Sequence, residues 1–148
     1  MGTPQNNTNV AKAVRKEYAA ANLPQTTLGT LFTVTGKVLV SDIVGEVITT
    51  AIQAQANSIK LVNTTTVGAD TDMCAALEIN GDAIGTFYTI TGTPADAMIA
   101  TTSGVAVSQA TPMIVSAGTI QLNTTASSTG KVKWTLYYIP LETGSKVA

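Results

Sequence analysis

The hydrophobic positions of this chain follow two different periods, one before residue 26 and one after it. At ~100° per residue, a single arc of about 80° holds the larger apolar side chains of the first segment, Val10, Val14, Tyr18 and Ala21. This spacing predicts a short helix over Val10–Ala21. Pro24 then ends it, because the residue before a proline disfavours helical dihedrals.

From Thr26 onward, short apolar segments with a period near two are separated by turns that contain glycine. We predict strands at Leu28–Val34, Val38–Val40, Ile43–Ile52, Ser58–Thr65, Asp72–Ile79, Ala83–Ile90, Ala97–Thr101, Val105–Ser108, Pro112–Val115, Thr119–Thr125 and Lys131–Leu141. Many short strands at this spacing indicate an all-β fold, an antiparallel β-sandwich or jelly roll. The predicted division is an N-terminal arm over residues 1–24, helical or extended, and a sandwich domain over residues 25–148.

Two of these segments carry a more specific prediction. Asn80-Gly81 lies between two apolar runs and is the strongest hairpin signal in the chain. In the last strand, alternate side chains belong to opposite faces. The face predicted to be core holds Val132, Trp134, Leu136 and Tyr138, and the opposite face, exposed or covered by a partner, holds Lys131, Lys133, Thr135 and Tyr137.

The composition adds a prediction about partners. Apolar residues make up 45% of the chain and charged residues only 11%, against a usual share of about 25%. Threonine, with 26 residues, is the main polar residue, and the formal net charge is −1. A surface with so little charge favours a protein that is covered by neighbouring subunits. The alternative is that Thr, Ser and Asn hydrate a free monomer sufficiently.

The residue types also limit the chemistry. The chain has no His, which removes the commonest general base and metal ligand. Cys74 is the single cysteine, so no intrachain disulfide is possible, and its apolar surroundings favour a buried thiol. Asp70, Asp72, Asp82 and Asp96 lie in turns, where acidic residues commonly stabilise the turn itself. We therefore expect a protein that is not an enzyme and that needs no cofactor and no metal.

Several classes of partner and location are disfavoured in the same way. Eight Lys plus Arg against nine Asp plus Glu give no basic field for nucleic acid. No run of 18 apolar residues is present, so we expect no membrane partner. Residues 1–9 lack the basic and apolar regions of a secretory signal, which predicts synthesis in a cytoplasm.

A set of local sequences carries a resemblance to a known family. They are Asn80–Gly85 (NGDAIG), Ala117–Leu122 (AGTIQL), Ser128–Gly130 (STG) and the alternating run from Val132 to Pro140. Together with the His-free, Thr-rich composition, they resemble capsid cement (decoration) proteins of the jelly-roll type from tailed bacteriophages. The resemblance implies a virion protein, made in the host bacterial cytoplasm. It would bind the outside of a capsid as a dimer or trimer and lock neighbouring copies of the major capsid protein together.

Two other functions stay open at this point. One is a different virion part, such as a tail or tail-tip β-sandwich. The other is a carbohydrate-binding sandwich in which Trp134, Tyr137 and Tyr138 form a stacking platform. The alternative role for Trp134 is a core side chain on a central strand.

The candidate partner-binding residues lie in the N-terminal segment. A helix this short needs a surface on which to bury its apolar side chains, either on its own domain or on a partner. Cations opposite that stripe could reach acidic groups of neighbouring subunits. The candidates are Val10, Lys12, Val14, Arg15, Lys16 and Tyr18.

Overall fold

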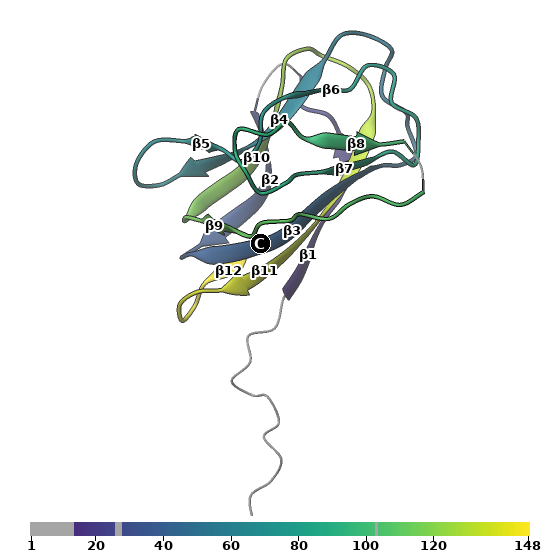
Figure 1. Cartoon of the computed structure of the whole chain (residues 1–148). Coiled ribbons are helices and arrows are strands. Elements are labelled where there is room, and N and C mark those ends of the chain that lie inside the picture. Colours follow the sequence, from purple (N-terminus) through teal and green to yellow (C-terminus); the bar gives the residue numbers. More distant parts are fainter. Residues whose placement is uncertain (1–13, 26–27, 103) are drawn as a thin grey trace, which may run out of the picture.

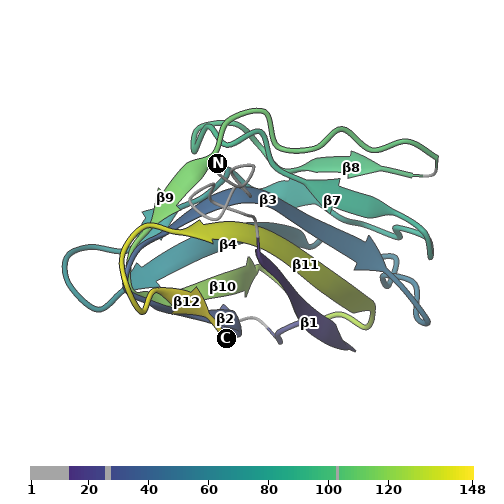
Figure 2. The same cartoon turned by 90° about the horizontal axis from the view of Figure 1, so that it is seen from below.

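The computed structural model describes residues 14–25, 28–102 and 104–148, and over these residues the fold is two antiparallel sheets packed face to face (Figures 1 and 2). Sheet A contains β1 (Val14–Asn22), β3 (Val38–Val47), β7 (Phe87–Thr89), β8 (Ile99–Thr101), β9 (Met113–Val115) and β11 (Lys131–Pro140). Sheet B contains β2 (Leu28–Thr35), β4 (Ser58–Thr65), β5 (Thr71–Asp72), β6 (Leu77–Glu78), β10 (Gly118–Thr124) and β12 (Lys146–Val147). The predicted all-β sandwich is confirmed.

The order of the strands identifies the sandwich as a jelly roll. Sheet A has the order β1-β11-β3-β7-β8, with β9 also paired to β3. Sheet B has the order β12-β2-β10-β4-β5, with β6 also paired to β4. The chain passes from one sheet to the other at each step from β1 to β4, and again from β9 to β12. This double winding of antiparallel strands is the jelly-roll arrangement, to which β12 adds a short strand beside β2.

The core lies between the sheets and is centred on β11. Val132, Trp134, Leu136 and Tyr138 are all 5% exposed or less, so the predicted core face of this strand is confirmed. The Trp134 ring stacks on Tyr88, with centroids 6.4 Å apart. Gly45 lies directly opposite Trp134 on β3, where an added Cβ would stand 2.8 Å from the indole ring. The absence of a side chain at Gly45 thus gives the indole its space.

The predicted N-terminal helix is wrong over the residues that the structure describes. Residues 14–22 form strand β1, which pairs antiparallel with β11 in sheet A, and residues 10–13 lie outside the described residues. The backbone N–H and C=O groups of β1 pair with the edge of β11. This tertiary pairing overrides the weak helical preference of the segment. β1 is therefore a strand of the sandwich, and the predicted division of the chain at residue 24 is tested by the truncation described in the Discussion.

Two further local predictions are wrong. Asn80-Gly81 does not join a hairpin, because the strand before it, β6, pairs with β4 in sheet B and the strand after it, β7, pairs with β3 in sheet A. The turn instead carries the chain from one sheet to the other, with Gly81 at a φ of 74°. Residues 105–108 form no strand and lie in the connection between β8 and β9.

Tyr88 makes a buried polar contact that gives the fold a pH dependence. Its hydroxyl donates a hydrogen bond to Asp82 Oδ2 at 2.7 Å. Burial, together with this bond and the negative charge of Asp82, raises the pKa of Tyr88 well above its usual value of 10. The raised pKa means that the neutral phenol stabilises the fold fully below pH 10, and that this contribution is lost progressively as the pH rises above it.

We therefore predict that, in the Tyr88→Phe variant, the free energy of unfolding falls less steeply with rising pH in alkali. The free energy of unfolding of the wild type, measured by urea titration, should fall more steeply above about pH 10 than that of the variant. Equal slopes for the two proteins would show that the ionisation of Tyr88 does not limit alkaline stability.

Candidate protein-binding surface

The structure does not bring the predicted partner-binding residues together on one exposed face. Val10 and Lys12 lie outside the described residues. Side chains directly opposite each other in a ladder share a face, and Val14, Lys16 and Tyr18 lie opposite the buried residues of β11. They therefore point to the core side of sheet A, whereas Arg15 points outward. Tyr18 is half-buried and meets Phe32 of sheet B edge to face, with ring centroids 6.2 Å apart.

The free edge of β1 has features that discourage pairing with another strand. Arg15 and Glu17 form an ion pair on its outer side, and Lys16 is a charged side chain on its inner side. A register shift between Tyr18 and Ala21 also bends the edge. Charges, inward-pointing lysines and bulges are the devices by which proteins prevent edge-to-edge association. We therefore expect a binding surface on the faces of the sheets rather than at this edge.

The outer face of sheet A carries a cluster of large apolar side chains beside the charged residues Arg15, Glu17, Asp42, Glu46, Lys131 and Lys133. Each of its outward apolar residues has at least one neighbour along the strand that is buried in the core, so alternation places the residue itself on the outer side. We call this surface face A. Its outward apolar residues are Leu39, Val44, Phe87, Ile99, Ile114, Tyr137 and Ile139. Antiparallel sheets of this kind usually have one solvated, polar face, so this composition indicates a face that another surface covers.

The most exposed part of face A lies where β9, β3 and β11 run side by side. Ile114 is directly opposite Leu39, and Leu39 is directly opposite Ile139, so the three form one row across the sheet. Tyr137 lies two residues before Ile139 on the same face of β11. Ile114 is 68% exposed and Tyr137 is 37% exposed, while Leu39 and Ile139 are half-buried. We call these four residues the apolar patch.

The outer face of sheet B, called face B, has the opposite character. Most of its outward side chains are hydroxyls and amides, namely Thr30, Thr33, Thr64, Thr119, Gln121 and Asn123. The Thr64 hydroxyl donates to Gln121 Oε1 at 3.2 Å, and Gln121 Nε2 donates to the Thr30 hydroxyl at 3.3 Å. Lys60 and Asp72 add an ion pair of 2.8 Å. Face B is therefore suited to water, and it supplies a matched control for every substitution on face A.

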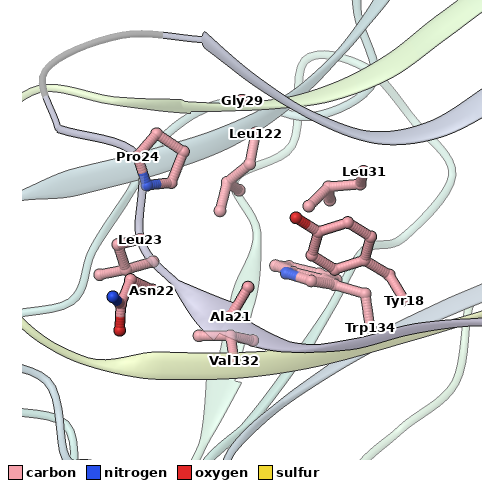
Figure 3. Close-up of a pocket in the computed structure, with 10 residues that line it drawn as sticks. All are labelled: Tyr18, Ala21, Asn22, Leu23, Pro24, Gly29, Leu31, Leu122, Val132 and Trp134. Carbon is pink, nitrogen blue, oxygen red and sulfur yellow. The ribbon is translucent and has the colours of Figure 1, made fainter.

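A small cavity opens at the edge of the sandwich between β1 and β2 (Figure 3). Its volume is about 30 Å³, which is room for about one water molecule. Apart from the Tyr18 hydroxyl, the Asn22 amide and the Trp134 indole N–H, its side chains are apolar, and they include no acid–base pair. The lining residues are Tyr18, Ala21, Asn22, Leu23, Pro24, Gly29, Leu31, Leu122, Val132 and Trp134. The cavity thus offers no arrangement for catalysis.

The remaining candidates for chemistry are also placed by the structure. Burial raises the pKa of the Cys74 thiol, and the Leu61 N–H lies 3.4 Å from its sulfur. The described residues contain no group of three or more His, Cys, Asp or Glu side chains that could hold a metal ion. Trp134 is only 1% exposed, so it cannot form the sugar-stacking platform considered from the sequence. Within the same residues, no helix is long and apolar enough to span a membrane.

No family model matches this chain. No curated protein matches it either. Among solved structures, it is similar to a chain described as "Structure of infectious bursal disease virus Gx strain", with 11% sequence identity and a TM-score of 0.22. The similarity covers 91% of this chain, which spans 33% of that one. A likeness of this size carries no argument about function.

Proposed function

We propose that this chain is a non-enzymatic structural protein of a virus particle, and that it works by packing face A against other protein subunits. More specifically, we propose a cement (decoration) protein that binds the outer surface of a tailed-bacteriophage capsid and holds neighbouring coat subunits together. The observation that carries the proposal is the contrast between the large apolar side chains of face A and the hydroxyls and amides of face B on the same small sandwich.

Three other features support this reading. The jelly roll is an architecture that viral capsid proteins use, although lectins and cupins share it. Charged residues are only 11% of the chain, which suits a protein whose surface is covered by neighbours. The sequence itself resembles cement proteins at Asn80–Gly85, Ala117–Leu122, Ser128–Gly130 and Val132–Pro140.

The test uses the virus whose genome encodes this chain, prepared with the gene intact and with the gene interrupted. We expect particles that lack the chain to assemble but to release their DNA at a lower temperature. Adding the purified chain should restore the release temperature, and electron microscopy should locate the added density on the shell. Density at the tail alone would support the tail protein considered from the sequence, and absence from the particle would contradict a virion role.

Two matched variants connect the function to face A. Ile114→Asp places a charge in the apolar patch, while Gln121→Asp places the same charge on face B. We expect Ile114→Asp to weaken binding to the shell by about tenfold or more, since a charge buried at an interface without a partner is costly. Gln121→Asp should bind as the wild type does. Equal weakening by both variants would remove face A from the proposed function.

A further inference from the structure

We infer that the outer face of β11 binds a second copy of this chain about a two-fold axis, with Arg15 of each copy facing Asp42 of the other. The inference deepens the proposed function, since it names the first partner of face A. In such a dimer β11 lies at the interface between the copies, while Ile114, two strands away on β9, lies toward its margin and is left to contact the shell.

The inference starts from one row of residues across sheet A. Arg15 on β1 lies directly opposite Tyr137 on β11, and Tyr137 lies directly opposite Asp42 on β3. All three point to the outer side, because Leu136 and Tyr138, on either side of Tyr137, are buried. Neighbouring strands are about 4.8 Å apart. A cation and an anion therefore stand at equal distances on either side of a partly exposed tyrosine.

This row is self-complementary under a two-fold rotation. If the axis runs along β11 between two facing copies, Tyr137 meets Tyr137 of the second copy, and Ile139 meets Ile139. The same rotation exchanges the two sides of the row, so each Arg15 comes to face the Asp42 of the other copy. In an isologous interface every contact between unlike residues occurs twice. The pairing thus provides two ion pairs around an apolar centre.

The local contacts leave both charged groups on the outer side. Asp42 Oδ1 accepts a hydrogen bond from the Gln109 backbone N–H at 3.3 Å, which holds the carboxylate at the β3 end of the row. Arg15 forms an ion pair with Glu17, two residues along β1 on the same side, and the side chains are 56% and 39% exposed. A guanidinium has five N–H donors, so Arg15 can bind a second carboxylate as well.

Farther along face A, two lysines of β11 also lie near the axis. Lys131, six residues from Tyr137, forms no ion pair within the described residues and would approach its counterpart at the far end of the strand. Lys133 also lies on β11, four residues from Tyr137, and it would approach its own counterpart near the same axis. Its ammonium is 3.8 Å from Glu46 Oε2, so each Lys133 brings its own counter-charge. The outward position between these two rows is occupied by Thr135, which is neutral.

A charge exchange tests the pairing. Arg15→Asp and Asp42→Arg should each weaken dimerisation by about tenfold or more, because each change makes two like-charge contacts. The double variant should recover most of the lost affinity, since it reverses both ion pairs. Dimerisation is measured by sedimentation equilibrium at low salt. The exchanged pair Lys60→Asp with Asp72→Lys on face B is the control, and it should leave the dimer unchanged.

A second measurement does not depend on the stability of the Asp42 variant. In the Tyr137→Cys protein, a bis-maleimide that spans the ~10 Å between stacked sheets should link two copies. Gln121→Cys on face B should give no linked dimer, and Cys74 is buried in both proteins.

Three outcomes would overturn the inference: a wild-type monomer at tens of micromolar, a double variant no better than the singles, or equal crosslinking at positions 121 and 137. Each is distinguishable from failure of the proposed function. A chain that stays monomeric but still binds the shell, and loses that binding in Ile114→Asp, would place the shell itself on face A.

Discussion

Replacing Trp134 by Ala is expected to lower the free energy of unfolding by about 3–5 kcal/mol, as other deletions of large buried side chains do. Trp134 is 1% exposed and lies on β11, which is paired on one side with β1 and on the other with β3. Its indole stacks on Tyr88 and fills the space above Gly45. Removal of the ring would leave a cavity that the two sheets cannot close without moving. The change is measured by urea denaturation.

Tyr137 supplies the matched control for this prediction. It is an aromatic residue of the same strand, three positions away, but it points to face A and is 37% exposed. Tyr137→Ala should therefore cost the folded chain less than about 1 kcal/mol, in the range of other surface changes. If both variants lost the same stability, or if Trp134→Ala lost none, the assignment of β11 as the centre of the core would be wrong.

A form of the chain that begins at Gln25 is expected to be unfolded or to lose most of its stability. The truncation removes β1, which pairs with β11 from Val14 to Asn22, and it removes Leu23, which is 3% exposed. It also removes Tyr18, which packs on Phe32. Each lost hydrogen bond costs about 0.5–1.5 kcal/mol and each buried apolar side chain about 1.5–3 kcal/mol. Together these are comparable with the ~5–15 kcal/mol that stabilises a typical domain.

The control for this truncation removes the opposite end of the described chain. A form ending at Gly144 loses β12, which pairs with β2 at Lys146 and Val147, and it loses the two backbone hydrogen bonds between Ala148 and Thr33. Its melting temperature should fall by much less than that of the form beginning at Gln25. A form beginning at Gln25 that melts at the wild-type temperature would support the division into arm and sandwich predicted from the sequence.

The sequence predicted the class of fold because most strands alternate clearly, but it misplaced β1. In this segment a register shift between Tyr18 and Ala21 interrupts the alternation of the strand. The alanines that follow Tyr18 have high helix propensity, and charged residues occupy positions that are apolar in other strands. The pairing with β11 that makes it a strand depends on residues more than a hundred positions away, so no local pattern contains it.

Face A was predicted only in part, for a related reason. The alternation of β11 correctly placed Tyr137 on the outer side. The runs Val38–Val40 and Met113–Val115 are apolar without interruption, so they give no sign of which side chain points outward. Only the register, which joins Ile114, Leu39 and Ile139 in one row, shows that these runs contribute to one surface. The candidate residues of the N-terminal segment do not share one face, because successive side chains of a strand, such as Arg15 and Lys16, point to opposite sides of the sheet.

The central claim, that protein covers face A and leaves face B in water, is tested most directly by site-directed thiol labelling. Thr135→Cys and Gln121→Cys each place one thiol on the outer side of an interior strand, on face A and face B respectively, while the native Cys74 is buried. The maleimide labelling rate of each variant in its assembled form is divided by its rate in dilute solution. We predict a ratio well below one at position 135 and a ratio near one at position 121. Equal ratios at the two positions, or protection at position 121 alone, would contradict the claim.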